Sequence, residues 1–114
     1  MSAARREALL WLASRVSAMI LALCVVVHLA TMIVAARGGL TAAEILGRTR
    51  GSMVWALFYG TFVIAVAVHA PLGLRTVLGE SARCPERVLD MGLLLFGILV
   101  LFTGLRAVVA VTMA

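Results

Sequence analysis

The chain has no lysine and only five acidic residues among its 114, and charged residues make up 13% of it. Hydrophobic residues make up 64%, and the mean hydropathy is +1.15. A soluble domain of this size could not bury so much apolar surface. The shortage of charge therefore excludes an ordinary soluble domain and predicts that lipid is the solvent.

The ten basic residues are all arginines, and the net charge is +5. No basic cluster interleaved with aromatic residues is present, so the sequence does not favour nucleic-acid binding. The arginines lie at the ends of apolar runs, where they match lipid headgroups. Cys24 lies in an apolar run and Cys84 in a charged loop, so we expect neither a disulfide nor a shared metal. No cleavable signal sequence is evident.

Three apolar runs each exceed the roughly 20 residues that a helix needs to cross a bilayer. They extend from about Ala8 to Ala36, Ser52 to Leu78 and Val88 to Met113. The runs lack the alternating pattern of barrel strands, so they predict an all-α integral membrane protein, a three-helix bundle forming one domain over residues 1–114. Thr41 and Glu44 have the spacing of a capping box, which predicts a short interfacial helix from Thr41 to about Leu46.

The distribution of arginines favours a cytoplasmic N-terminus. Six fall on the N-terminal side of the predicted bundle and four on the other. The first group is Arg5, Arg6, Arg15, Arg75, Arg83 and Arg87, and the second is Arg37, Arg48, Arg50 and Arg106.

The two histidines are His28, in the first run, and His69, near the end of the second. An ionisable side chain at membrane depth is costly without a partner, so each is a functional-site hypothesis. The runs have no lysine and few acids, and a metal, namely haem iron, is then the partner best suited to an imidazole in a small helical membrane protein. For His28, a hydrogen bond to a carbonyl of a neighbouring helix is an equally good interpretation.

A stripe of mainly small and polar residues surrounds His28 on the first helix, and such a stripe faces other helices or a cofactor. Its members are Ser14, Ser17, Leu21, Cys24, His28 and Thr31. In the second run, Gly73 lies one turn after His69 and leaves room for a flat macrocycle. Pro71 cannot donate to the carbonyl of Ala67. Arg75 can extend to an interfacial carboxylate, such as a haem propionate, or to a lipid phosphate.

The two histidines are expected at different depths. If Arg15 and Arg75 lie at the same membrane face, His28 is thirteen residues, about 20 Å, from that face, and His69 is six residues, about 9 Å. Two axial ligands of one iron must share a height, and tilt does not comfortably remove a mismatch of about 10 Å. We therefore expect either two haems or a single ligand here, with the remaining axial ligands on another polypeptide.

The stretch Ser14-Arg15-Val16-Ser17, the three-span layout and His69-x-x-x-Gly73-Leu74-Arg75 resemble the cytochrome b membrane-anchor subunits of succinate dehydrogenase and fumarate reductase. The resemblance covers nearly the whole chain. It implies that His69 is an axial haem b ligand and that Arg15 and Ser17 lie near the ubiquinone pocket and the haem propionates. His28 matches the first-helix histidine of the di-haem anchors, which have five helices in one chain. Single-haem anchors usually show His-Arg-x-Ser-Gly, and here Ser14 and Ala18 replace the histidine and the glycine.

The resemblance also implies a function in electron transfer. The chain would be the haem b-binding anchor of a succinate:quinone oxidoreductase in a bacterial inner (cytoplasmic) membrane, with one or two haems. It would dock the flavoprotein and iron–sulfur subunits, pair with a second membrane-anchor subunit, and help to bind quinone. Arg15 is the first candidate for stabilising charge on the quinone.

Two other hypotheses remain open. The chain could be a small transporter or channel subunit in which His28 and His69 carry protons or bind substrate. Intramembrane acids would support that hypothesis, and the apolar interiors contain none. The chain could also be a structural anchor without haem, which a spectrum would distinguish.

Overall fold

The computed structural model describes residues 1–81 and 84–113. These form four helices: α1 (Ala3–Arg37), α2 (Ala42–Thr49), α3 (Met53–Ser81) and α4 (Glu86–Thr112). Helices α1, α3 and α4 are long and apolar enough to cross a membrane. The predicted class is therefore confirmed, including the short helix between the first two spans. Arg83, placed above with the N-terminal-side arginines, lies outside the described residues.

Local capping explains where the helices begin. Helix α1 starts at Ala3, five residues before the predicted start, because the Ser2 hydroxyl accepts a hydrogen bond from the Arg5 amide at 3.2 Å. The Thr41 hydroxyl accepts one from the Glu44 amide, also at 3.2 Å, as the capping pattern predicts. Gly39 has φ +66°, a left-handed conformation that favours glycine and turns the chain from α1 into α2.

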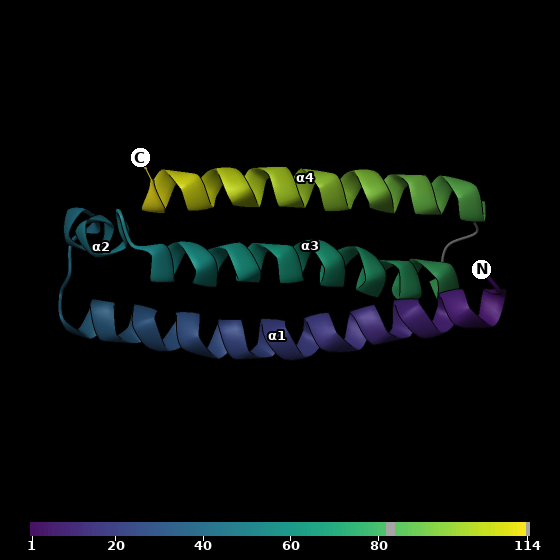
Figure 1. Ribbon diagram of the computed structural model, residues 1–114, viewed down its shortest axis with the longest axis horizontal. Helices are drawn as coiled ribbons and strands as arrows, with labels where there is room; N and C mark the ends of the chain where they lie inside the picture. The colour runs from purple at the N-terminus through teal and green to yellow at the C-terminus, as the bar shows by residue number, and fades with distance from the viewer. Residues whose placement is uncertain (82–83, 114) are drawn as a thin grey trace.

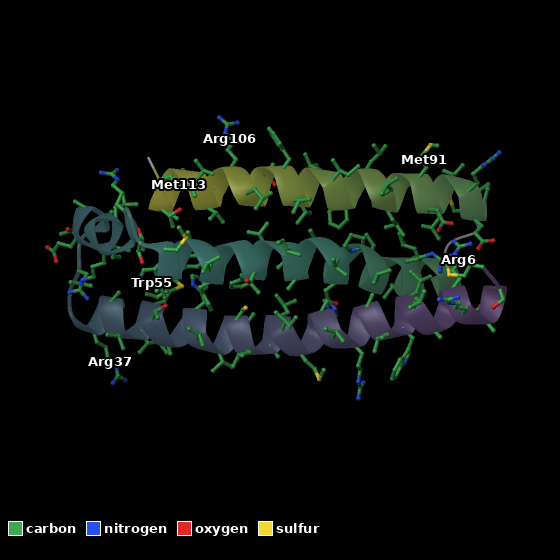
Figure 2. All side chains as sticks on the ribbon, viewed as in Figure 1. Arg6, Arg37, Trp55, Met91, Arg106 and Met113 are labelled. Atoms are coloured by element: carbon green, nitrogen blue, oxygen red, sulfur yellow. The ribbon has the colours of Figure 1, made fainter. Side chains whose placement is uncertain are left out.

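The three long helices lie side by side with α3 in the middle, and α2 crosses one end of the row (Figure 1). Successive long helices are antiparallel. The start of α1, the end of α3 and the start of α4 therefore meet at one end, here called the N-terminal end. The opposite end, which carries α2, is called the α2 end. Arg6 lies at the N-terminal end, whereas Arg37 and Arg106 lie toward the α2 end (Figure 2).

Two glycines of α4 allow α3 and α4 to pack closely. A Cβ on Gly104 would lie 2.5 Å from Cγ1 of Val63. A Cβ on Gly97 would lie 3.2 Å from Cγ of Pro71 and 3.4 Å from the carbonyl oxygen of Ala67. This carbonyl is the one that Pro71 leaves without a helical donor. Because Gly97 has no side chain, the backbone of α4 can pack against α3 where this helical hydrogen bond is missing.

At the α2 end, the junction between α2 and α3 caps the last turn of α4. The Thr49 hydroxyl donates to the carbonyl of Val111 at 2.7 Å, and the Gly51 amide donates to that of Thr112 at 2.7 Å. Carbonyls at a helix C-terminus have no partner within the helix and need one in lipid. These two bonds therefore fix α2 against α4.

Candidate functional site

His69 lies where α1 and α3 pack together, opposite Ser17. Ser17 and Cys24 are the buried residues of α1, each 5% exposed, and both belong to the stripe expected to face another helix. The Nδ1 atom of His69 lies 3.5 Å from the Ser17 hydroxyl oxygen, at the long limit of a hydrogen bond. The first and second spans thus bring these two residues together.

The Ser17 hydroxyl has one proton, which it donates to the Ser14 carbonyl at 3.0 Å. Toward His69 it can therefore only accept. In this arrangement of the Ser17 proton, the neutral imidazole carries its own proton on Nδ1 and has its lone pair on Nε2. This is the tautomer in which Nε2 can bind a metal.

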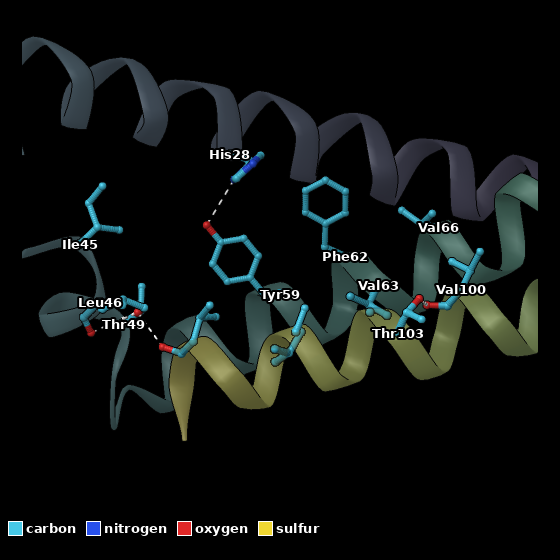
Figure 3. Close-up of a pocket in the computed structure, with 14 residues that line it drawn as sticks. His28, Ile45, Leu46, Thr49, Tyr59, Phe62, Val63, Val66, Val100 and Thr103 are labelled. Atoms are coloured by element: carbon cyan, nitrogen blue, oxygen red, sulfur yellow. Dashed lines mark hydrogen bonds between the residues drawn. The ribbon is translucent and has the colours of Figure 1, made fainter. Parts of the chain in front are cut away.

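His28 lies toward the α2 end, where its Nδ1 atom is 3.2 Å from the hydroxyl of Tyr59 on α3 (Figure 3). The imidazole meets the Tyr59 and Phe62 rings edge-on, with centroids 5.7 and 5.8 Å apart, and Tyr59 stacks on Trp55. The Tyr59 hydroxyl can donate to the imidazole or accept from it, so this contact does not select a tautomer. The hydrogen bond expected for His28 was to a carbonyl of a neighbouring helix, and the partner found on α3 is instead the side-chain hydroxyl of Tyr59.

Tyr59 is a site residue that the sequence analysis missed. It is the only tyrosine in the chain, and it lies inside an apolar run. A phenol at membrane depth needs a hydrogen-bond partner, which was the available signal. That the partner is His28 depends on how α1 and α3 align, and the sequence alone does not specify that alignment.

A cavity of about 620 Å³ adjoins His28 and Tyr59 (Figure 3). Its walls come from all four helices, with Leu46 and Thr49 of α2 at one end and Val63 and Gly104 between α3 and α4. A second cavity, of about 930 Å³, is also lined by α1, α3 and α4 and reaches Arg6, Arg75 and Asp90 at the N-terminal end. The His28 cavity is almost entirely apolar apart from the imidazole and a few hydroxyl groups.

The two imidazoles lie at clearly different heights. Ser17, level with His69, precedes His28 by eleven residues on α1, which is about 16 Å of helix. Tyr59, level with His28, precedes His69 by ten residues on α3, about 15 Å. The separation exceeds the expected 10 Å because Arg75 lies further out than Arg15. Within one chain, these two histidines cannot share an iron.

Arg75 is held by carboxylates of α4. Its Nε donates to Asp90 at 2.9 Å and its Nη2 to Glu86 at 3.4 Å, while Arg6 lies 3.6 Å from Asp90. The sequence predicted that Arg75 could reach an interfacial carboxylate, and the structure supplies two, Asp90 and Glu86, in place of the propionate or lipid phosphate named there. Arg15, in contrast, is exposed and has no ion pair among residues 1–81 and 84–113.

Comparison of the chain with protein-family models, curated proteins and solved structures finds no match.

In the part of the chain that the structure describes, no group of three or more His, Cys, Asp or Glu side chains is arranged to hold a metal ion. The described residues could provide a metal with only one imidazole at each of two separate heights. Any metal bound at either one needs further ligands from a cofactor or another chain.

Proposed function

We propose that this chain is a haem b-binding membrane-anchor subunit of a succinate:quinone oxidoreductase, of the succinate dehydrogenase and fumarate reductase type. The observation that carries the proposal is the state of His69. Its Nδ1 atom faces the Ser17 hydroxyl, and when that hydroxyl donates to the Ser14 carbonyl, the Nε2 atom of the neutral imidazole keeps a lone pair at membrane depth. Metal-binding histidines usually use their second ring nitrogen in this way.

The surroundings of His69 fit a haem. Gly73 lies one helical turn further along α3, and a Cβ built on it would have no heavy atom within 4 Å. Helix α3 is therefore open at Gly73, one turn from the imidazole, where a flat macrocycle would lie. His28 would be the ligand of a second haem in the two-haem form. The separation in height supports axial partners supplied by a second membrane-anchor subunit.

A bound haem would supply a one-electron store between the iron–sulfur subunit and the quinone. The side chains of this chain would orient and enclose it. Arg15 lies two residues from Ser17, close to the height of His69, and its guanidinium has no acid partner among the described residues. It is thus available to a propionate or to a reduced quinone oxygen. Arg75 would also contact the propionate, through the guanidinium N–H groups that do not donate to Asp90 or Glu86.

The N-terminal end would face the cytoplasm of a bacterial cell and dock the flavoprotein and iron–sulfur subunits. Arg5, Arg6 and Arg87 provide positive charge there, in accord with the distribution of arginine in membrane proteins.

The test is a haem count on the complex purified with its native partners, by pyridine haemochrome and reduced-minus-oxidised spectra. One or two haems b per complex, with a flavoprotein and an iron–sulfur protein co-purifying, would support the proposal. No haem in that same complex would restrict this chain to docking and quinone binding. No haem and no flavoprotein would favour the transporter hypothesis.

A further inference from the structure

We infer that Ser17 is a positioning residue that holds His69 in the tautomer with its lone pair on Nε2. The inference rests on the proposed haem-binding function and deepens it. Ser17 acts through His69, by accepting the Nδ1 proton, and needs no contact with the cofactor or the quinone.

The direction of this hydrogen bond is set within α1. The Ser17 hydroxyl donates back to the carbonyl of Ser14, three residues earlier, at 3.0 Å. Serine commonly makes this bond inside helices. With its one proton used, the oxygen presents only lone pairs to α3, and His69 Nδ1 lies 3.5 Å away. While it makes this bond, Ser17 presents α3 with a hydrogen-bond acceptor.

Burial makes this acceptor hard to replace. Ser17 is 5% exposed, and no other hydrogen-bond partner of His69 is found among the described residues. Hydrocarbon offers no acceptor, and an N–H without one is costly there. Without Ser17, the imidazole would be free to carry its proton on Nε2, and the ligating nitrogen would be blocked for part of the time.

The matched control is Cys24→Ala. Cys24 lies two turns further along α1, is also 5% exposed, and has no hydrogen bond among the described residues. Ser17→Ala and Cys24→Ala each remove one heavy atom from the packing of α1. Only Ser17→Ala removes the acceptor facing His69, so a difference between the two variants reports the hydrogen bond and not the packing.

The first measurement is the ring tautomer of His69, by ¹⁵N NMR of the full chain in lipid bilayers with labelled histidine. With two histidines in the chain, His28→Ala assigns the signals. The Nδ1–H form is expected in the wild type and in Cys24→Ala, and a mixture with the Nε2–H form in Ser17→Ala. The same tautomer in Ser17→Ala as in the wild type would overturn the inference.

The second measurement is haem affinity in the purified complex, followed as haem transfer to an excess of apo-globin. Loss of a hydrogen bond behind a metal ligand typically weakens binding by about 10- to 100-fold. We expect that loss in Ser17→Ala and nearly wild-type retention in Cys24→Ala. Equal retention in both variants would overturn the positioning role. A wild-type complex without haem would refute the proposed function. The tautomer of His69, measured by NMR, would still show whether Ser17 accepts the Nδ1 proton.

Discussion

The two histidines occupy chemically different halves of the same pair of helices. At the N-terminal end, His69 meets a serine whose proton is already donated within α1, so the polarity of the contact is fixed. At the α2 end, His28 meets the Tyr59 phenol among aromatic rings and beside a cavity of about 620 Å³. The first contact selects one tautomer, and the second allows either.

The difference teaches that membrane depth alone does not define a metal ligand. Both imidazoles lie at membrane depth and both use Nδ1 for a hydrogen bond. They differ in what the hydroxyl facing each imidazole contacts in turn. The Ser17 hydroxyl also donates to the Ser14 carbonyl, whereas the Tyr59 hydroxyl has no second hydrogen bond among the described residues. In the proposed function, His69 would bind iron through Nε2. His28 can bind a haem or serve as one polar group in an aromatic cluster.

The largest expected effect is that of His69→Ala. The variant removes the proposed ligand, so the haem assigned to His69 should be lost or bound much more weakly. Pyridine haemochrome on the complex purified with its native partners measures this. Haem content equal to that of the wild type would exclude His69 as a ligand. The proposed difference in ligation between His69 and His28 would then be lost.

His28→Ala tests the other half. In a complex with two haems, it should remove one haem signal and leave the signal that depends on His69. Separate redox titration of the two haems distinguishes them. Two intact haems in His28→Ala would assign His28 to the aromatic cluster alone.

Gly104→Ala should disturb the α2 end and leave the His69 end unchanged. Its Cβ would lie 2.5 Å from Val63, which lines the cavity beside His28. Overpacking of this kind costs about 1–3 kcal/mol. The free energy of unfolding in mixed detergent measures the cost, and Val63→Ala in the same chain should restore much of it. Gly92→Ala is the control on α4, because a Cβ there would meet no heavy atom within 4 Å. A cost no larger than that of Gly92→Ala would mean that α3 and α4 do not pack as described.

Tyr59→Phe should have the smallest effect. It removes one hydrogen bond to His28, worth about 0.5–1.5 kcal/mol, and retains the ring packing. The ¹⁵N signals of His28 should shift, and those of His69 should not. A shift confined to His69 would contradict the register of α1 and α3.

Much of the fold follows from the sequence because only helices and closed barrels can span a lipid bilayer. Uncharged runs between charged residues predicted three spanning helices to within a few residues at most ends, and Thr41 with Glu44 predicted α2. The early start of α1 was missed because the cap at Ser2 lies among charged residues, where hydropathy gives no signal.

The site was less predictable, because it depends on contacts between helices. Periodicity put Ser17 and His28 on one stripe of α1, but the partners on α3 depend on the register of two apolar surfaces. Small residues such as Gly97 and Gly104 set how closely helices pack, and their partners are not encoded locally. Asp90 could have been paired with Arg75, since each lies at the membrane edge of its span.

Pro71 makes the last part of α3 depend on its contacts with α4. The carbonyl of Ala67 receives no helical hydrogen bond, so the ladder of α3 lacks one rung two residues from His69. The segment after Pro71 is instead held from outside its own helix, by close packing against Gly97 and by the ion pair of Arg75 with Asp90, both on α4.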